Sequence, residues 1–535
     1  MSAVAVRATG VVQPVVRRSP ALAPASGLDR RRLIAFLCMV FGMFMAILDI
    51  QVVSASLSQI QAGLSASADE IPWVQTSYLI AEVIMIPLSG FLSRVISTRY
   101  MFAISAGGFT LMSFMCAQAT SIEQMIIWRA LQGFIGGGMI PTVFASAFTV
   151  FPRDKQPLVG PLIGLVATLA PTIGPTVGGY LTDLLSWHWL FLINILPGIF
   201  VTLSTWFLVD FDDPDWSLLE KFDWTGLVSM AVFLGALEYV LEEGPSKDWF
   251  DSNLIVDLAA ISVISAAIFF WRAFTAPQPI VDLGAFRNRN FWTGSLFSFV
   301  MGIGLYGLTY LYPVFLARVR GYSSLQIGET MFVTGLCMFF SAPIVGRLST
   351  LLDPRWMIGI GFGSFAAGTY IASGLTADWD FYELLAPQVL RGCGLMLAMV
   401  PINNVALGTL PPQRMKNASG LFNLTRNLGG AVGLALINTL IDKREDLHLA
   451  RLHEAVAWGR DRAEATLANL EAAMVSFGSD AELAATKRLA GMVRQQAVVM
   501  SLADVFYVLT GLFVLLVLMV PLMRRPARVG GGGGH

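Results

Sequence analysis

The sequence predicts an all-α polytopic membrane protein. Of its 535 residues, 55% are hydrophobic and 13% are charged, and the mean hydropathy is +0.66. Soluble proteins carry about 25% charged residues, so this composition lies far from theirs. Apolar runs of roughly 20 residues, long enough to cross a bilayer as helices, recur along the chain. The net charge of −1 argues against a nucleic-acid partner.

Fourteen apolar segments are expected to be transmembrane helices. Arg30, Arg31 and Arg32 precede the first one, and no signal-peptide cleavage site follows it, so we expect this segment to be retained. The expected spans cover residues 33–58, 73–93, 101–119, 123–148, 158–181, 189–209, 224–243, 254–272, 290–317, 325–349, 356–374, 383–409, 417–441 and 500–523.

Basic residues indicate the orientation of these spans. Alternate short loops carry Arg94, Arg153, Arg355 and Arg414, whereas the loops between them are mainly acidic. Loops rich in arginine and lysine stay on the cytoplasmic side of a membrane. We therefore expect both termini to be cytoplasmic.

An internal repeat divides the chain into two halves. Gly90-Phe-Leu-Ser recurs as Gly346-Arg-Leu-Ser, 256 residues later, and each half holds six expected spans. Such repeats are common in secondary transporters, whose substrates bind between the repeats. The expected domains are a cytoplasmic disordered tail (1–29), an N-terminal six-helix half (30–210), two inserted transmembrane helices (211–275), a C-terminal six-helix half (276–525) with an extracytoplasmic helical loop (442–499), and a tail ending in a glycine run (526–535).

Three ionisable residues lie deep within expected spans. Asp49 and Arg129 fall at a similar depth in the outer half of the membrane, and Glu82 falls near the midplane. Such residues are costly and should face a cavity or a partner. We expect all three to couple transport to protons; the alternative is that Asp49 and Arg129 only tie helices together. Glu82 has no basic residue within its own span, so we expect it to take up a proton more readily than Asp49.

One span is rich in residues that break helices. The segment 162–180 contains two prolines and the run Gly174-Pro175-Thr-Val-Gly178-Gly179. Membrane helices tolerate such kinks because neighbouring helices satisfy the freed backbone groups. Gly174 and Gly178 share one face, where a second helix can approach closely. This span is either a packing element or a gate of a transporter.

Five stretches together resemble signatures of the major facilitator superfamily. They follow the order of its fourteen-span drug:proton antiporters of the EmrB/QacA type, and the resemblance covers residues 30 to 525 approximately. The stretches are Leu48-Asp49 with Leu57, Arg129-Ala-Leu-Gln132-Gly133 with Gly136 and Gly137, Gly174-Pro175-Thr-Val-Gly178-Gly179, Trp187-His-Trp189-Leu-Phe-Leu-Ile-Asn194, and Arg426-Asn427-Leu-Gly429-Gly430. The resemblance implies a major facilitator fold of two six-helix halves plus two additional inserted transmembrane helices.

Several positions depart from the pattern of this family. In the loop after the second span, the usual Asp and Gly positions fall at Arg94 and Ser97. His188 stands where Arg is common, and Ala170 stands where the antiporter motif often has Gly. The first departure puts the family's usual charge contact between the two halves in question, and it leaves the fold assignment unchanged.

The resemblance implies a secondary active exporter of hydrophobic or amphipathic compounds, a multidrug efflux protein of the bacterial inner membrane that works by proton antiport and alternating access. Its partners would be lipophilic small molecules, protons and membrane lipid. No cofactor is expected, because the proton gradient supplies the energy. A Walker A run is absent, which disfavours ATP-driven transport. No spacing of cysteines or histidines suggests a metal site, and we expect no enzymatic activity.

Two alternative functions stay open. A proton-coupled transporter of one defined metabolite or organic or fatty acid could hold an anion with Arg129, Arg391 and Arg426. A membrane-embedded lipid-modifying enzyme is the more remote alternative, because it would need a clustered catalytic set that the sequence lacks.

Polar and aromatic residues of the central spans are candidates for the substrate cavity, although such residues also pack between helices. The candidates are Gln132, Tyr306, Tyr310, Asn403, Asn404, Asn423, Arg426 and Asn427. Arg426 could contact an anionic substrate or cap polar groups between helices, and the sequence does not separate these roles.

The long loop between the last two spans is expected to be helical. Leu447, Leu449 and Leu452 alternate with Arg451 and Glu454 in a pattern typical of an amphipathic helix. The loop could lie on the membrane surface. Alternatively, it could dock a membrane-fusion adaptor protein, as some exporters that resemble this chain do.

Overall fold

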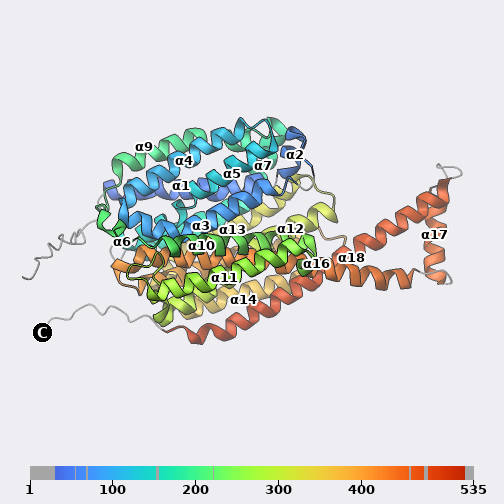
Figure 1. Ribbon diagram of the computed structural model, residues 1–535. Coiled ribbons are helices and arrows are strands. Elements are labelled where there is room, and N and C mark those ends of the chain that lie inside the picture. The colour runs from blue at the N-terminus through green and yellow to red at the C-terminus, as the bar shows by residue number, and fades with distance from the viewer. Residues whose placement is uncertain are drawn as a thin grey trace, which may run out of the picture.

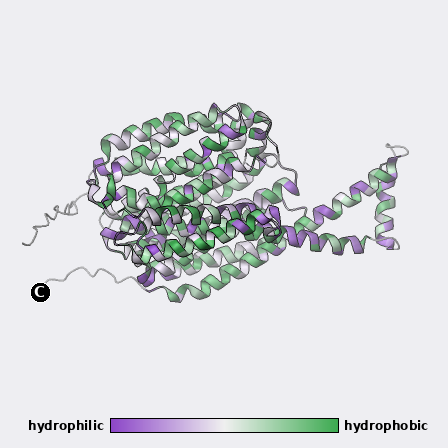
Figure 2. Cartoon of the chain, in the orientation of Figure 1, coloured by the Kyte–Doolittle hydropathy of each residue, from purple (hydrophilic) through white to green (hydrophobic). Residues whose placement is uncertain are grey.

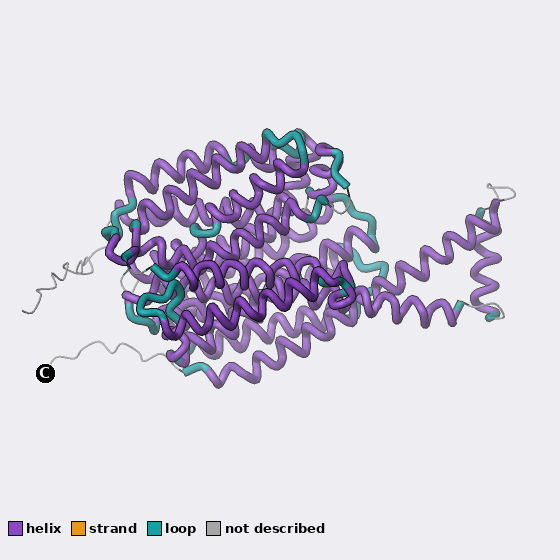
Figure 3. The backbone as a smooth tube through the Cα atoms, in the orientation of Figure 1, coloured by secondary structure: helices purple, strands orange, loops and turns teal. Residues whose placement is uncertain are grey.

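The computed structural model describes residues 30–54, 56–67, 70–151, 156–220, 222–456, 460–474 and 480–524. These residues form a bundle of long helices, with loops at its two ends and no strand (Figures 1 and 3). The expected tails at 1–29 and 526–535 lie outside the described residues. The predicted all-α fold class is confirmed.

The helices follow one another with short connections. The first half contains α1 (Arg30–Ser54), α2 (Leu57–Leu64), α3 (Trp73–Val95), α4 (Ser97–Ala117), α5 (Ile122–Gly136), α6 (Met139–Val150), α7 (Gln156–Leu184), α8 (Trp189–Leu192) and α9 (Ile195–Leu208). Next come α10 (Trp224–Glu243) and α11 (Asn253–Thr275). The second half contains α12 (Arg289–Arg318), α13 (Ser324–Leu351), α14 (Pro354–Ala372), α15 (Phe381–Gly408), α16 (Met415–Ala455), α17 (Asp461–Ala473) and α18 (Ala481–Met519).

Short 3-10 turns occur in several connections. They are η1 (Trp216–Leu219), η2 (Pro245–Lys247), η3 (Trp249–Asp251), η4 (Leu283–Arg287), η5 (Pro412–Arg414) and η7 (Val520–Leu522). Capping boxes fix the starts of two helices: Ser323 and Gln326 bond reciprocally at α13, and Asp380 and Glu383 do so at α15. Each pair satisfies backbone N–H groups that a helix start leaves free.

The bundle has the dimensions and the surface of a membrane protein. Twelve helical segments in the described ranges are long and apolar enough to cross a membrane. The other two expected spans, 158–181 and 356–374, coincide with α7 and α14, although the total of fourteen stays a prediction. Large apolar side chains such as Leu196, Phe207 and Val263 are exposed on the outside, where lipid would cover them (Figure 2).

The two halves meet along two seams. α3 packs on α16, and α7 packs on α13. Glycines make the first seam close: a Cβ atom added at Gly90 would lie 2.8 Å from the Lys416 carbonyl oxygen, and one at Gly420 would lie 3.1 Å from the Ile86 carbonyl oxygen. The backbones therefore approach without intervening side chains, as is common between membrane helices.

The inserted pair α10 and α11 lies beside the α3–α16 seam, with α10 packed against both α3 and α16 (Figure 1). The Trp249 indole donates a hydrogen bond of 2.8 Å to the Thr439 hydroxyl on α16. On the other side, the Tyr239 ring of α10 lies 5.4 Å from the Trp73 ring of α3. α10 thus contacts both halves.

A charge contact joins the halves at the end of the bundle that holds Arg94 and Arg99, which we call the basic end. The Lys416 ammonium group, at the start of α16, lies 2.5 Å from the Asp212 carboxylate and donates a 2.8 Å hydrogen bond to the Ser93 carbonyl oxygen. Although Arg94 replaces the family's acid, Asp212 in the loop after α9 supplies a carboxylate. A charge contact therefore joins the two halves, and its acidic residue is Asp212, because Arg94 stands at the family's acidic position.

The turn between α3 and α4 keeps a backbone conformation that favours glycine. Ser97, at the family's Gly position, has φ of +76°. Side chains other than glycine pay roughly 1–2 kcal/mol in this region. The next residue compensates in part, because the Thr98 backbone N–H donates to the Asp212 carboxylate at 3.1 Å. The loop shape therefore persists without its glycine.

Between the last two spans, the chain forms a projection from the end opposite the basic end. α16 and α18 continue out of the bundle as unbroken helices, and α17 connects them at the tip (Figure 1). Where they leave the bundle, the His448 imidazole lies 2.8 Å from the Asp504 carboxylate. The helices thus stand away from the bundle end, and they do not lie across it as a surface hairpin would. Polar residues cover much of them (Figure 2).

The basic-end contact leads to a first prediction. Asp212→Asn removes the negative charge that holds Lys416 and should shift the population toward a form separated at the basic end, by about tenfold, because a hydrogen bond to a charged group is worth about 1.5–3 kcal/mol. Electron–electron resonance between spin labels at Tyr100 and Trp356, in a background without the four cysteines, measures the separation.

Asp213→Asn is the matched control, because Asp213 is the exposed neighbour of Asp212. An Asp212→Asn distance distribution that equals those of the wild type and the control would show that this contact does not hold the halves together.

Candidate transport site

A buried ion pair joins α1 to α5. The Arg129 guanidinium donates to the Asp49 carboxylate at 2.7 Å, and both side chains are fully shielded from solvent. The Asn194 amide donates to the same carboxylate at 2.7 Å, and the Gln132 amide does so at 3.4 Å. Three partners, two on α5 and one just before α9, therefore surround one negative charge, as the low dielectric of a membrane protein requires.

The rest of this polar network also lies inside the N-terminal half. The Ser113 hydroxyl on α4 accepts hydrogen bonds from Gln132 at 2.7 Å and from Asn194 at 3.1 Å. The Arg129 side chain donates to the Val74 carbonyl oxygen at 3.1 Å. The guanidinium also lies 4.3 Å from the centre of the Tyr78 ring, a favourable cation–π geometry. The network thus ties together α1, α3, α4, α5 and the residue before α9.

A cavity of about 570 Å³ lies between the halves, away from the basic end. Part of its lining comes from residues near the helix ends opposite the basic end, including Leu57, Pro72 and Arg318. A smaller cavity of about 60 Å³ adjoins it more deeply and shares Ile50 and Tyr306 with it. Ligand pockets usually measure about 300–1,000 Å³, so the larger cavity can hold an organic molecule.

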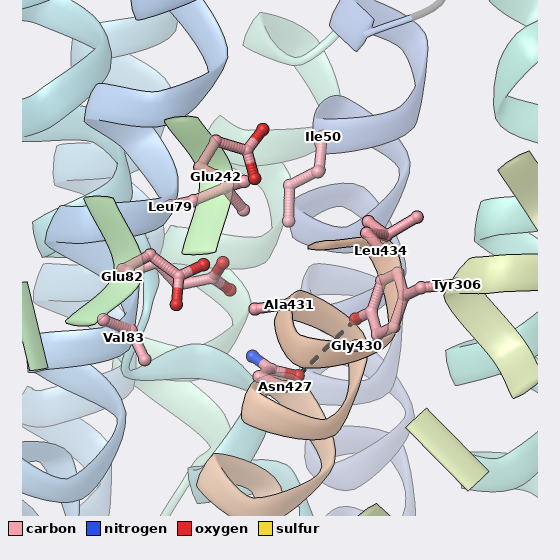
Figure 4. Close-up of a pocket in the computed structure, with 11 residues that line it drawn as sticks. Ile50, Leu79, Glu82, Val83, Glu242, Tyr306, Asn427, Gly430, Ala431 and Leu434 are labelled. Carbon is pink, nitrogen blue, oxygen red and sulfur yellow. Dashed lines mark hydrogen bonds between the residues drawn. The ribbon is translucent and has the colours of Figure 1, made fainter. Parts of the chain in front are cut away.

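Glu82 of α3 lines the smaller cavity, together with Tyr306 and Asn427 (Figure 4). Its side chain is 3% exposed, and no hydrogen bond or ion pair to it occurs among the described residues. The Tyr306 hydroxyl, on the opposite wall, lies 3.5 Å from the Asn427 amide oxygen. Glu82 is therefore placed differently from Asp49, which lines neither of these cavities and has several partners.

Two acidic residues that the sequence analysis missed also face this site. Glu238 and Glu242 of α10 line the smaller cavity, and Glu242 lines the larger one as well. Both residues lie within the expected span 224–243, so the rule that flags ionisable residues inside spans could have found them. Figure 4 shows Glu82 and Glu242 on one side of the cavity and Tyr306 with Asn427 on the other.

The glycine–proline segment of α7 packs against α1 and α13. A Cβ atom added at Gly178 would lie 2.9 Å from the Val52 carbonyl oxygen and 3.1 Å from the Ser56 hydroxyl. Pro175 lines the larger cavity, and α7 stays helical through this region. Gly174 is buried, as is Gly179. The four motif residues thus lie on a helix that borders the larger cavity. This helix contacts α1 in the N-terminal half and α13 in the C-terminal half.

The expected cavity residues divide into two groups. Tyr306, Tyr310 and Asn427 line the two cavities described above. The remaining five do not line either cavity; they are Gln132, Asn403, Asn404, Asn423 and Arg426.

Arg426 caps a neighbouring amide. Its guanidinium donates to the Asn423 side-chain oxygen at 2.5 Å and lies 5.2 Å from the centre of the Phe144 ring on α6. The contact with Asn423 is of the kind expected if Arg426 caps a polar group, although this amide lies on the same helix. Arg391 of α15 is buried against the Thr309 hydroxyl and the Tyr312 ring, and two of its nitrogen atoms lack a hydrogen-bond partner in the described part of the chain.

Comparison with known proteins agrees with this architecture. A family profile described as Major Facilitator Superfamily matches residues 39–434, which is most of the chain. The chain belongs to the major facilitator superfamily. This membership makes it a transporter integral to a membrane, and it confirms the expectation that the chain is not an enzyme.

Relatives within the superfamily carry names that refer to export and resistance. The chain is 42% identical over 421 residues to the colistin resistance protein EmrB of Acinetobacter baumannii, covering 79% of this chain and 82% of that one. It is 29% identical to the multidrug export protein EmrB of Escherichia coli strain K12, covering 92% and 95%. It is also 29% identical to the fatty acid resistance protein FarB of Neisseria gonorrhoeae, covering 92% and 96%. The predicted EmrB-type resemblance is confirmed.

Solved structures of the superfamily share the fold. The human organic anion transporter MFSD10 superposes with a TM-score of 0.56 at 12% identity, covering 91% of this chain and all of that one. A bacterial homologue of the lysosomal transporter Spinster, in an inward-facing conformation, superposes with a TM-score of 0.53 at 16% identity, covering 94% and 100%. At these identities the likeness supports the fold alone.

The buried network leads to a second prediction. Asp49→Asn and Arg129→Gln each leave one uncompensated charge, so each should destabilise the protein by about 3–5 kcal/mol. The double variant removes both charges and should lose much less than the sum of the single losses. Thermal unfolding in detergent measures these differences.

The exposed pair Arg99 and Asp210, at 3.0 Å, is the matched control and should contribute about 0–1 kcal/mol. Additive losses at Asp49 and Arg129 would contradict a stabilising pair.

Proposed function

We propose that this protein exports hydrophobic or amphipathic compounds from the cytoplasm in exchange for protons, with Glu82 as the principal proton carrier. The observation that supports the proposal most directly is the position of Glu82. It lies on the wall of a central cavity, nearly buried and without a protein partner in the described residues. The prediction of a multidrug exporter agrees with the names of the relatives.

In this mechanism, a proton and a substrate compete for the same cavity. A buried carboxylate without a partner is costly when it is charged, so Glu82 holds a proton while the cavity lacks a positive group. Arrival of a cationic or bulky substrate displaces that proton. The two halves then rock about the central site, and opening to the outside lets a proton replace the substrate.

Asp49 and Arg129 would have a supporting role in this exchange. The hydrogen-bonded network around their ion pair links α1, α3, α4 and α5, which must move together when the N-terminal half rotates. Asp49 stays ionised while Arg129 remains at 2.7 Å, and it becomes available to protons only if the helices separate. The close contact of α7 with α1 at Gly178 would serve as the hinge of the outer gate.

The surroundings of the transporter follow from the same proposal. We place it in the inner membrane of a bacterium, with both termini in the cytoplasm, because the basic end carries Arg94, Arg99 and Arg355. The proton gradient would supply the energy, so no bound cofactor is needed. Lipid covers the exposed apolar surface of α9 and α11.

A second candidate is the export of an organic acid. Arg318 lines the larger cavity, and Arg391 is buried without a carboxylate partner among the described residues. A fatty acid anion could use either guanidinium. The three glutamates at the deeper cavity favour the first candidate, because they would repel an anion there.

The third prediction tests the proton carrier. Glu82→Gln mimics a permanently protonated acid, so it should still bind substrate but release no proton when substrate is added to the detergent-solubilised protein. Asp49→Asn should also reduce release, because it disturbs Arg129. A pH-sensitive dye records the release, and proteoliposomes with an imposed proton gradient record transport of lipophilic cations, neutral drugs and fatty acids.

Asp183→Asn, at an exposed site at the end of α7, is the control and should release protons as the wild type does. Wild-type proton release from both Glu82→Gln and Asp49→Asn would place the carrier elsewhere and refute this mechanism. Transport of fatty acids alone in the panel would favour the second candidate.

We further propose that the projection formed by α16, α17 and α18 docks an extracytoplasmic partner, such as a membrane-fusion adaptor protein. The projection stands away from the bundle end, which suits contact with another protein better than contact with lipid headgroups (Figure 1). Leu483, near the start of α18, is 71% exposed, so its apolar side chain is accessible to such a partner.

The fourth prediction tests this partner. Deletion of residues 447–494, closed by a short Gly-Ser linker, should abolish drug resistance in cells and leave transport by proteoliposomes intact. Leu483→Glu is the milder variant and should act in the same direction, whereas Glu482→Gln, at an exposed polar neighbour, should have no effect. Loss of transport in proteoliposomes as well would indicate a structural role and no docking role.

A further inference from the structure

The inserted helix α10 adds carboxylates to the central site from outside the two six-helix halves. Glu238 and Glu242 lie one turn apart on this helix, and both line the smaller cavity with Glu82. Glu238 is 6% exposed, so it is as deeply placed as a core residue. In the described ranges, it has no hydrogen bond or ion pair. A charged group in this position lacks the partners that buried charges otherwise require.

Three positive groups in the central region and near α10 have partners other than Glu238. The Arg129 guanidinium binds Asp49, and the Arg426 guanidinium donates to an amide on its own helix and faces an aromatic ring on α6. Lys247, beyond the end of α10, lies 3.4 Å from the Glu243 carboxylate. None of the residues that line the smaller cavity is cationic. A positive partner for Glu238 inside the smaller cavity would therefore have to belong to a bound molecule.

The shape and lining of the site indicate what such a partner looks like. The carboxylates stand beside apolar side chains such as Leu79 and Leu434, which line both cavities. The smaller cavity has room for a compact charged group, at about 60 Å³, and the adjoining cavity of about 570 Å³ has room for a bulky apolar body. Tyr306 borders both and offers a ring face near the junction.

We infer that Glu238 on the inserted helix α10 is a substrate-binding residue, which holds the positive group of a cationic amphiphile together with Glu82 while the apolar part lies in the larger cavity. This inference rests on the proposed function, because it names the charge class of the exported compounds. It also gives the inserted pair a direct part in recognition. α10 packs on α3 and on α16, so it presents Glu238 where the two halves meet.

The test uses two single-chain amphiphiles of similar length and opposite charge, decylammonium and decanoate. The purified full-length protein in detergent should bind decylammonium in preference to decanoate. Glu238→Gln should weaken binding of the cation by about tenfold or more, because a contact to a charged group is replaced by one to a neutral amide. Glu238→Asp keeps the charge and should retain more of the affinity than Glu238→Gln.

Glu243→Gln is the matched control, since Glu243 is an acid on the same helix that lies outside both cavities and pairs with Lys247. Its cation affinity should equal that of the wild type. Unchanged unfolding temperature and unchanged binding of a neutral lipophile show that Glu238→Gln is folded.

Equal cation affinity in Glu238→Gln and the wild type would overturn the inference. So would a wild-type protein that transports neutral lipophiles with proton flux and binds no decylammonium, although the proposed function would then stand. Absence of proton-coupled transport for every compound tested would instead remove the proposed function.

Discussion

The ion pair between Asp49 and Arg129 constrains the whole N-terminal half. Neither charge can leave the other without exposing an unpaired ion to an apolar interior, which costs several kcal/mol. Since Arg129 also bonds to the α3 backbone, and Asn194 and Gln132 share Ser113 of α4, helices far apart in sequence are held at fixed distances. These contacts favour motion of the N-terminal half as one body, which the proposed rocking mechanism requires.

The buried acids of the protein differ in their surroundings. Asp49 is surrounded by donors and sits away from the cavities, whereas Glu82 and Glu238 face open space without protein partners in the described residues. Burial alone does not distinguish them, because all three side chains are nearly inaccessible. The difference lies in the partner of each acid: protein groups surround Asp49, whereas in the proposed mechanism protons or ligands serve the other two. We therefore assign a structural role to Asp49, and we assign the exchange of protons and substrate to Glu82 and Glu238.

Much of this could be predicted from the sequence, because membrane helices carry strong local signals. Apolar runs located the spans, and depth arithmetic brought Asp49 and Arg129 to the same level, where the structure pairs them. The place of α10 could not be predicted, since its packing beside the α3–α16 seam depends on tertiary contacts such as that of Trp249 with Thr439. The contact of Asp212 with Lys416 could not be predicted either. Acidic loop residues carry little weight in orientation rules, and the two residues lie 204 positions apart in the sequence.

The unbroken path of α16 and α18 from the bundle into the projection has a mechanical consequence. A helix is stiff over tens of ångströms, so a tilt of the C-terminal half is carried along these two helices to α17. With a rise of about 1.5 Å per residue, residues 442–455 of α16, which follow the expected span, form an arm of roughly 20 Å. A tilt of about 10° would displace its tip by roughly 3 Å, a motion of the size that repacks an interface between proteins. Each transport cycle would therefore displace the tip of the projection outside the membrane, once for each molecule exported.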